Sequence, residues 1–441
     1  MREKLGSRLG FLMLAAGCAV GLGNVWRFPY VVGTNGGAAF VILYLACLAL
    51  LGLPLLLAEL AIGRGAQSGI AGAMAKLAPS RLSRFWGTLG TILFFGNFLL
   101  MIYYTDVAGW LVKYTADYAV GAAPADPGAA FKALTADRPT CALYMGIVVL
   151  VASLVCAGGV SKCVERVTKV MMIALFALLT VLAVRALLLP GAEKGLAFYL
   201  RPDWSYFAAH PVKVVMEAMG QAFFTLSIGV GAMAIFGSYV DRRRSLVTEA
   251  SWIVVIDTLV AFLAGLVVFP SCAANGVDYT AGPGLIFVAL PAAFAKMPGG
   301  GVWGFGFFLF LSFAALTTVI AVFECLIGGV LDTGRGRRAA VALGVGVVVA
   351  LASLPCVLWD GVLDWEDFAV SQLWLPIGAL AMCLFVTHGS FGWGWRGFSE
   401  EASAGEGLKL PDAVRYHLTY AVPVLILAVM AFGFHQKFFA S

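Results

Sequence analysis

Long apolar stretches, separated by short polar or Gly- and Pro-containing clusters, divide the chain almost from end to end. A helix of about 20 consecutive apolar residues crosses a bilayer, so each stretch of this length predicts a transmembrane helix. Eleven are predicted, at residues 8–32, 38–62, 85–119, 141–157, 165–189, 212–239, 246–271, 302–330, 338–358, 368–387 and 415–435. The pattern predicts an all-α polytopic membrane protein that has the lipid bilayer as a partner.

The first apolar stretch is interrupted near its middle by GCAVGLGN at residues 17–24. Non-helical backbone persists at membrane depth only where it is buried in protein or lines a polar cavity, because each unpaired amide or carbonyl costs several kcal/mol. The interruption therefore predicts a binding site. Close helix packing through small residues is the alternative interpretation.

A second interruption, QAFFTLSIGVG at residues 221–231, lies five spans after the first. Many transporters contain two repeats of opposite topology, each with a corresponding interrupted helix. We therefore predict two inverted five-helix repeats, at 1–190 and 191–390, with broken helices 1 and 6. Residues 391–441 supply a peripheral eleventh helix.

Charge helps to predict the orientation. Hydrophobic residues make up 61% of the 441 residues and charged residues 12%, and the net charge is +5. Lys and Arg mark cytoplasmic loops, and they occur here in alternate loops. These residues are Arg2, Lys4 and Arg8, then Arg64, Lys76, Arg81 and Arg84, then Lys162, Arg166 and Lys169, then Arg242, Arg243 and Arg244, and finally Arg335, Arg337 and Arg338. We predict a cytoplasmic N-terminus, an external C-terminus and no nucleic-acid partner.

The cysteines and histidines do not show the spacing expected of an enzyme active site. The nine cysteines lie mostly inside spans without metal-ligand spacing, and we interpret them as packing residues. Whether Cys141 and Cys272 pair stays open. The four histidines lie near span ends with no nucleophile beside them. No cleavable signal is visible, so Met1 is expected to start the mature chain, and no obligate protein partner is inferred.

Seven motifs, in order along nearly the whole chain, resemble those of the neurotransmitter:sodium symporter family. They are AVGLGNVWRFP at 19–29, NGG at 35–37, Glu59 with Gly63 and Arg64, Tyr103 with Tyr104, QAFFTLS at 221–227, GPGL at 282–285 and AALTT at 314–318. The resemblance implies a leucine-transporter-like fold, sodium-coupled symport by alternating access, and location in a bacterial inner membrane.

Two broken helices can offer free amides to a carboxylate and free carbonyls to a hard cation, which suits an amino acid with sodium. The resemblance implies two sodium ions. The first would use Ala19, Asn24, Thr225 and Asp257, and the second Gly17, Val20, Ala314, Thr317 and Thr318. Hydroxyl bonds within their own helix are the alternative for the two adjacent threonines.

Asp257 and Ala261 depart from the chloride-dependent relatives, which resemble this chain but have an amide and a serine at these positions. A fixed anion beside sodium can replace chloride electrostatically, so we predict chloride-independent transport. Proton antiport through Asp257 on the empty return step stays open. A structural pairing of Asp257 with a neighbouring helix is the alternative.

The resemblance also implies a substrate site. Tyr104, Leu22 and Gly23 would bind the carboxylate, and Ala19, Phe224, Thr225 and Ser227 the ammonium group. The wall would consist of Leu100, Val107, Phe224, Val230, Met233, Thr318 and Val322. Gly21, where amine transporters place an aspartate, favours amino acids. Val230 replaces an aromatic residue, so we predict a large neutral substrate, aliphatic or aromatic.

Gates are predicted on both sides of this site. Arg27 would pair with Asp367 outside, with Phe224 as a lid, and Arg2 would pair with Asp332 inside. Tyr239 would support the inner pair. Ordinary interface charges are the alternative, and Leu5, where relatives often have Trp, weakens the inner gate.

Glu59 is expected to accept bonds from the broken sixth helix, whereas Glu217, Glu324 and Asp106 receive no role. Two other functions remain open. A proton-coupled or sodium-independent exchanger of the same fold would not need Thr317 and Thr318. A ligand sensor would bind without transport.

Overall fold

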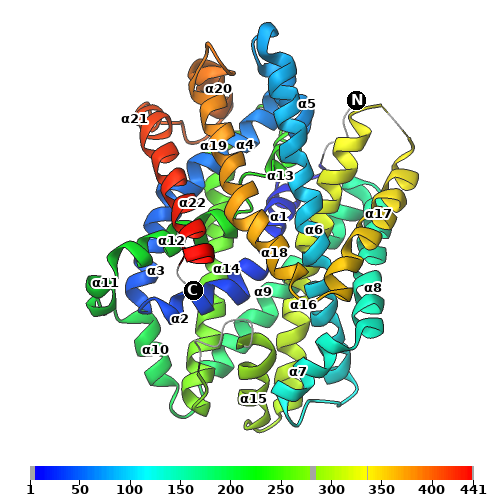
Figure 1. Ribbon diagram of the computed structural model, residues 1–441, viewed down its shortest axis with the longest axis vertical. Helices are drawn as coiled ribbons and strands as arrows, with labels where there is room; N and C mark the ends of the chain where they lie inside the picture. Colours follow the sequence, from blue (N-terminus) through cyan, green and yellow to red (C-terminus); the bar gives the residue numbers. More distant parts are fainter. Residues whose placement is uncertain (1–4, 279–284, 335, 440–441) are drawn as a thin grey trace.

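The computed structural model describes residues 5–278, 285–334 and 336–439. Within these ranges the chain forms helices and their connections, with one isolated β-bridge between Arg244 and Glu406. Long helices form a bundle, with shorter helices at its two ends (Figure 1). This agrees with the predicted all-α class. The predicted gate residue Arg2 and residues 282–284 of the GPGL motif lie outside the described residues.

The first half of the chain contains an interrupted helix followed by four longer apolar segments. In chain order its elements are α1 (Arg8–Ala19), η1 (Gly23–Arg27), α2 (Phe28–Thr34), α3 (Ala38–Cys47), η2 (Leu48–Gly52), α4 (Leu53–Ala66), α5 (Ile70–Leu77), η3 (Ser80–Leu82), α6 (Ser83–Ala119), α7 (Pro127–Ala136), α8 (Arg138–Ala157), η4 (Val160–Val164) and α9 (Glu165–Leu187).

The second half begins with two short helices and a second interrupted helix. Its elements are α10 (Ala192–Leu200), α11 (Ser205–Ala209), α12 (Pro211–Thr225), α13 (Ala232–Gly237), α14 (Leu246–Asn275), η5 (Leu285–Ala289), α15 (Leu290–Ala295), α16 (Gly300–Leu331), α17 (Arg338–Leu358), α18 (Val362–Phe368), η6 (Ala369–Trp374), α19 (Leu375–Thr387), α20 (Gly394–Ala402), α21 (Ala413–Tyr416), η7 (His417–Ala421) and α22 (Val422–Phe439).

Nine helices in the described ranges are long and apolar enough to cross a membrane. The pair Arg8–Ala19 and Gly23–Thr34, which is bent by 57° at its break, is a tenth candidate when it is counted as one span. The predicted sixth span corresponds to α12 and α13, which are each too short to be counted alone. The count of eleven spans therefore stays a prediction.

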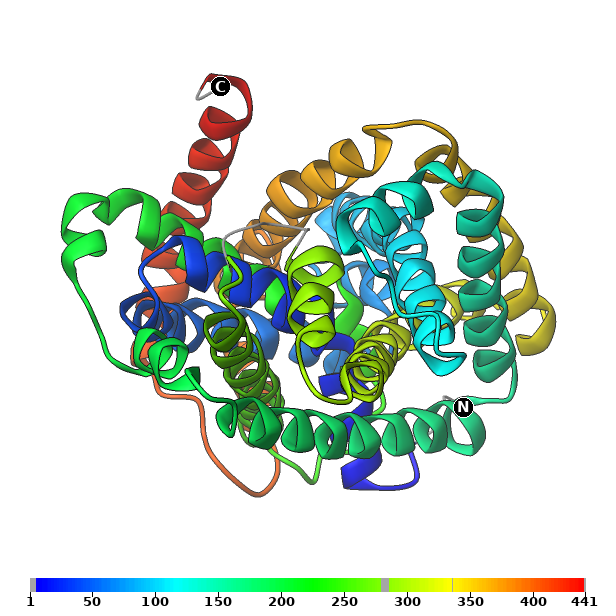
Figure 2. The ribbon, with the colours of Figure 1, turned by 90° about the horizontal axis from the view of Figure 1, so that it is seen from below.

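The short connecting helices lie at opposite ends of the bundle. In Figure 1, α5 and α20 lie toward the end of the bundle where the chain begins, and α7 and α15 lie toward the opposite end. This separation agrees with the predicted alternation of loops between two membrane faces; which face is cytoplasmic stays a prediction. Seen from below, α22 lies at the margin of the bundle (Figure 2).

Glycines bring α4 and α13 into backbone contact. A Cβ atom on Gly63 would lie 1.7 Å from the carbonyl oxygen of Ala234, and one on Gly237 would lie 2.1 Å from that of Leu60. Any larger residue would push these helices apart. The contact holds Glu59 of α4 beside the interruption in the sixth span.

Candidate functional site

The first interruption is stabilised by side chains that replace the missing helical partners. The Gly21 amide donates to Asn24 Oδ1 at 3.1 Å, and the Leu22 amide donates to the Tyr104 hydroxyl at 3.2 Å. All of these residues are buried. Buried backbone groups require such partners, so the local sequence and α6 together permit the break.

The second interruption, between α12 and α13, depends on a buried carboxylate. Glu59 Oε1 accepts from the Gly229 amide at 2.6 Å, and Glu59 Oε2 accepts from the Met233 amide at 3.1 Å. Asn97 Nδ2 donates to the Val230 carbonyl at 2.7 Å. The predicted role of Glu59 is confirmed, and Asn97 of α6 has a matching role that was not predicted.

The unwound backbone of the second interruption packs directly on α19. Gly229 has a φ of +113°, and a Cβ atom there would lie 2.0 Å from the Leu375 carbonyl oxygen. Only glycine combines this conformation with so close an approach. Movement of α19 would therefore be transmitted directly to the interruption.

Three of the four residues predicted for the first sodium ion meet at one carboxylate, and they come from three different helices. Asn24 Nδ2 donates to Asp257 Oδ1 at 2.7 Å, and the Thr225 hydroxyl donates to Asp257 Oδ2 at 3.0 Å. All three side chains are completely buried. Ala19 is the last residue of α1 and lines the cavity between the two interruptions. Carboxylate, amide and hydroxyl oxygens are the ligand types that hard cations prefer.

The residues predicted for the second ion form a cluster of neutral oxygens between α1 and α16. The Thr318 hydroxyl lies 3.2 Å from the Gly17 carbonyl oxygen, 3.1 Å from that of Val20 and 3.3 Å from that of Ala314. The Thr317 hydroxyl donates within its own helix, to the Ala314 carbonyl at 3.0 Å. The cluster brings the five predicted residues together. The Thr317 hydroxyl bonds within its own helix, as in the alternative interpretation, whereas the Thr318 hydroxyl bonds both within its helix and to α1.

A cavity of about 20 Å³ lies between the two interruptions. It is lined by Cys18, Ala19, Gly21, Leu22, Gly23, Leu100, Tyr104, Phe224, Ser227, Thr318 and Leu375. A cavity this size has room for about one water molecule, so a larger ligand requires the lining to move apart.

Eight of the predicted substrate residues line this cavity, namely Ala19, Leu22, Gly23, Leu100, Tyr104, Phe224, Ser227 and Thr318. Five others are described and buried but do not line it, namely Val107, Thr225, Val230, Met233 and Val322. Val230 is directed toward α6, where its side chain would lie 2.8 Å from a Cβ atom on Gly96. Its predicted place in the substrate wall therefore requires a rearranged cavity.

The external gate residues are not joined in this conformation. Arg27 Nη1 lies 3.4 Å from the Gly220 carbonyl oxygen, and its guanidinium lies 4.8 Å from the centre of the Phe224 ring. Asp367 accepts from the Ser371 hydroxyl at 3.1 Å. Between these described residues there is no Arg27–Asp367 ion pair, and this pair stays a prediction for another state. Phe224 does lie beside Arg27, as expected of a lid.

Asp332 and Tyr239, predicted for the cytoplasmic gate, have partners in the described ranges. Asp332 Oδ2 accepts from the Ser68 hydroxyl at 3.1 Å and from the Gly69 amide at 2.8 Å. The Tyr239 hydroxyl donates to Glu324 Oε1 at 2.8 Å. Since Arg2 is outside these ranges, its pair with Asp332 stays a prediction.

Two acidic residues extend the network near this gate. Glu324, which received no role from the sequence, is fully buried and also pairs with Arg338. Glu165 accepts from the Gly6 amide at 2.7 Å and from the Ser7 hydroxyl at 2.8 Å. The beginning of α1 is thereby attached to α9.

Sequence reasoning did not find Asn97, Leu375 or Glu165. Asn97 carried a usable signal, since a polar side chain within a predicted span needs a buried partner. Leu375 carried none, because an apolar residue in a membrane helix is expected everywhere. Glu165 begins α9 and gave no indication of its distant partner in the chain.

Together, the two interrupted helices and the buried oxygen clusters between them are features of a polytopic membrane transporter. The model of the sodium:neurotransmitter symporter family matches residues 2–122 and 136–439. The chain belongs to this family, so it is a sodium-dependent transporter of a small-molecule substrate rather than an enzyme.

Similarity to individual proteins agrees with this family assignment. An uncharacterised sodium-dependent transporter of Bacillus subtilis (strain 168), YhdH, is 36% identical over 86% of this chain and 86% of that protein. The sodium-dependent serotonin transporter of Drosophila melanogaster is 29% identical over 98% of this chain and 76% of that protein. The crystal structure of MhsT in complex with L-phenylalanine matches with a TM-score of 0.86 and 36% identity, covering 98% of this chain and 99% of that one. This similarity confirms the leucine-transporter-like fold.

Proposed function

We propose that this protein is a sodium-coupled symporter of large neutral amino acids that works by alternating access and does not require chloride. The observation that carries this proposal is the Asp257 carboxylate, which is buried between Asn24 beside the first interruption and Thr225 beside the second. A cation there would bind both broken helices at once. Its binding would therefore favour the conformation in which they are close together.

The amino-acid end of the substrate would bind to groups that line the same cavity. The Leu22 amide and the Tyr104 hydroxyl lie 3.2 Å apart, and η1 begins at Gly23 with its amides directed toward its N-terminal end. Such an end favours an anion, which here is the substrate carboxylate. The Ser227 side chain and the unwound backbone around it supply acceptors for the ammonium group.

Gly21 supports amino acids over amines that lack a carboxylate. A Cβ atom on Gly21 would lie 2.6 Å from the Tyr104 hydroxyl oxygen and 2.7 Å from Thr318 Oγ1. The break therefore has no room for an acidic side chain that would compensate a bare amine. The ligand has to supply its own negative charge.

A large neutral side chain matches the apolar chemistry of the remaining lining, which includes Leu100, Phe224 and Leu375, once the lining has moved apart. MhsT, similar along nearly the whole chain, is known in complex with L-phenylalanine. Apolar walls separate ligands that differ by one methylene by only about 1–3 kcal/mol, so we expect several aliphatic and aromatic amino acids to be accepted.

Chloride independence follows from the fixed charge of Asp257. An anion within a few ångströms of a desolvated cation supplies the stabilisation that a bound chloride would otherwise provide. Ala261, one turn later on α14, offers no hydroxyl to a chloride ion. On the return step the empty carrier could carry a proton on Asp257, which makes proton antiport a measurable extension of the proposal.

Alternating access would use the contacts at the two ends of the bundle. In this conformation the end with Asp332, Tyr239 and Glu165 is joined by several hydrogen bonds. We propose that this end is cytoplasmic in a bacterial plasma membrane, and that its contacts break as Arg27 and Asp367 approach each other on the opposite side.

The test is uptake of radiolabelled leucine, phenylalanine, tryptophan and methionine into proteoliposomes. An inward sodium gradient is compared with equimolar potassium, each as the chloride and the gluconate salt, with and without a protonophore. We expect accumulation that requires sodium, is unchanged in gluconate and includes at least one aromatic substrate.

Three outcomes would overturn parts of this proposal. Uptake that does not depend on sodium would contradict both proposed cation sites and would favour the proton-coupled exchanger. A large loss in gluconate would contradict the role of Asp257. Saturable binding without accumulation would indicate a sensor instead of a carrier.

A further inference from the structure

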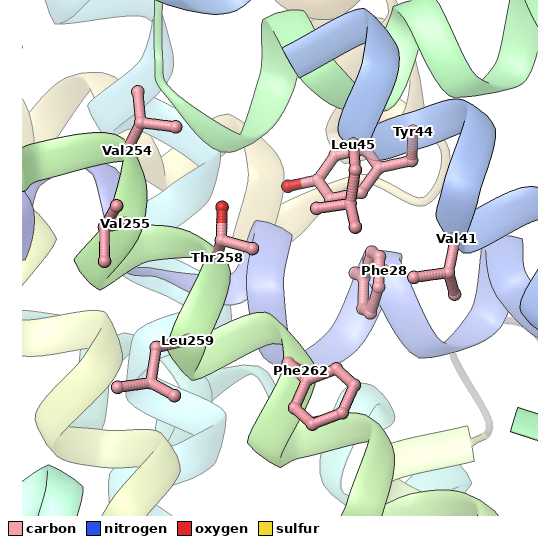
Figure 3. Close-up of a pocket in the computed structure, with 9 residues that line it drawn as sticks. All are labelled: Phe28, Val41, Tyr44, Leu45, Val254, Val255, Thr258, Leu259 and Phe262. Atoms are coloured by element: carbon pink, nitrogen blue, oxygen red, sulfur yellow. The ribbon is translucent and has the colours of Figure 1, made fainter. Parts of the chain in front are cut away.

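A cavity of about 320 Å³ opens on the side of the bundle between α2, α3 and α14 (Figure 3). Its floor is formed by Phe28 and Tyr44, which are buried. Its rim includes Leu45, Val255 and Leu259, whose exposed fractions are 41%, 52% and 46%. We refer to this cavity as the α3–α14 groove.

We expect the opening of the groove to face the hydrocarbon of the bilayer. The rim residues belong to Ala38–Ala66 and Leu246–Asn275, two helices that are long and apolar enough to cross a membrane. Leu45, Val255 and Leu259 lie well inside these helices, and no polar headgroup reaches such a depth. Lipid tails are therefore the molecules that meet this opening.

The groove matches the chemistry of an alkyl chain. Its lining is almost entirely carbon, and the hydroxyls of Tyr44 and Thr258 are the only side-chain polar groups among the lining residues. Its volume falls in the range of about 300–1,000 Å³ that is typical of small-molecule sites. Shallow lipid contacts on a smooth helix surface would not need a cavity of this size.

Tyr44 connects the groove to the ion-binding region. Its ring forms part of the floor, and its hydroxyl is buried. The hydroxyl interacts with the Asp257 carboxylate and with the Thr225 side chain. Thr258, which lines the groove, directly follows Asp257 in the chain. One wall therefore separates the groove from the first cation site.

We propose that the α3–α14 groove binds one acyl chain of a membrane phospholipid, and that this chain packs on Tyr44 and so influences cation binding at Asp257. The acyl-chain site stands independently of the transport activity. Its link to sodium rests on the proposed first cation site. Because coupling between two sites is reciprocal, sodium must change the occupancy of the groove if the chain changes the affinity for sodium.

The test uses the full chain in vesicles of phosphatidylethanolamine and phosphatidylglycerol that contain a phosphatidylcholine with a diazirine in its acyl chain. After irradiation, labelled peptides are identified by mass spectrometry. We expect residues 41–45 and 254–262 to be labelled several times more than the lipid-facing peptide around Val181 of α9, which is 57% exposed. Even labelling of all lipid-facing helices would overturn the proposal.

Leu259→Trp fills the opening of the groove, and Val181→Trp is the matched control on another lipid-facing helix. The first change should remove most of the labelling at residues 41–45, which the mutation itself does not alter, and the control should leave it intact. Equal labelling of residues 41–45 in both variants would contradict a defined acyl-chain site.

The link to sodium is tested by replacing sodium with potassium during labelling. We expect the yield in the groove to change about fivefold, the low end of typical coupling between sites, while the yield at Val181 stays constant. Tyr44→Phe should retain labelling and lose this sodium effect. A groove yield indifferent to sodium would overturn the link alone. Failure of the proposed symport would instead appear in uptake, which labelling does not require.

Discussion

The two proposed cation sites differ in charge and in the helices that they join. The first contains the Asp257 carboxylate, which already has hydrogen bonds to η1 and α12. The second contains only neutral oxygens from α1 and α16, and Thr318 supplies its contact across the helices. The first site carries its own electrostatic attraction, whereas the second depends on α1 remaining close to α16. An ion at the second site should therefore respond more directly to movement of α1.

The largest effect is expected from Asp257→Asn, which removes the charge and keeps the size. Removing one partner of a buried charge pair costs about 3–5 kcal/mol, so the apparent affinity for sodium should fall about 100-fold or more. The measurement is a sodium titration of substrate binding to the purified protein.

Asp106→Asn is the matched control, because Asp106 is also an almost fully buried acid within a span but lies outside both sites. Its titration should stay close to that of the unmodified chain. If Asp257→Asn also bound sodium normally, the fixed charge would have no part in either site, and the comparison would fail.

A smaller effect is expected from Thr318→Val, which removes a neutral ligand and the hydrogen bond to α1. A neutral hydrogen bond contributes about 0.5–1.5 kcal/mol, which corresponds to a loss of affinity of about 2- to 10-fold. Thr317→Val, the neighbouring control, should weaken binding less, since its hydroxyl is bonded within α16. A greater loss for Thr317→Val in the same titration would indicate that this hydroxyl turns toward the ion.

The dependence of the second site on α1 can be tested from a distance with Glu165→Gln. This change weakens the hydrogen bonds that attach Gly6 and Ser7 to α9. Coupling through a packed helix contributes about 0.5–2 kcal/mol, and a contribution near the lower end of this range would lower the affinity for sodium about threefold. In a double-mutant cycle, the effect should be non-additive with Thr318→Val and additive with Asp257→Asn. Additivity with Thr318→Val and non-additivity with Asp257→Asn would instead indicate that α1 is coupled to the first site.

Much of this arrangement could be predicted because it is encoded in short sequence segments. The glycines at residues 17–24 and 226–231 mark interruptions whatever surrounds them, and a carboxylate within a span such as Asp257 indicates a function by itself. Family motifs then predict which positions supply the ligands of a cation. For Gly17, Val20, Ala314 and Thr318, the structure shows that the predicted oxygens are in contact.

Contacts made by ordinary residues across the bundle could not be predicted in this way. Leu375 lines the central cavity because α19 packs on Gly229, and nothing in the apolar sequence of α19 distinguishes Leu375 from its neighbours. Arg27 was predicted to pair with Asp367 but lies against Gly220 and Phe224 in this conformation. Motifs can predict which residues form a gate, but the conformation determines which of them are in contact.

The smallest effect on sodium binding is expected from Val230→Phe. This change tests the part of the substrate site that would contact the substrate side chain, without altering either proposed cation site. Val230 is fully buried beside Gly96, and it is not among the residues that line the central cavity or the cation ligands. An aromatic ring there should reduce the room for a large substrate. A preference for tryptophan over leucine should then shift by about tenfold, since apolar walls discriminate by about 1–3 kcal/mol. Competition uptake with both amino acids measures the shift, and a sodium titration of the same variant should match the unmodified chain. If the preference stayed constant, Val230 would serve only to pack against α6, and the breadth of the substrate range would have to come from Leu100, Phe224 and Leu375.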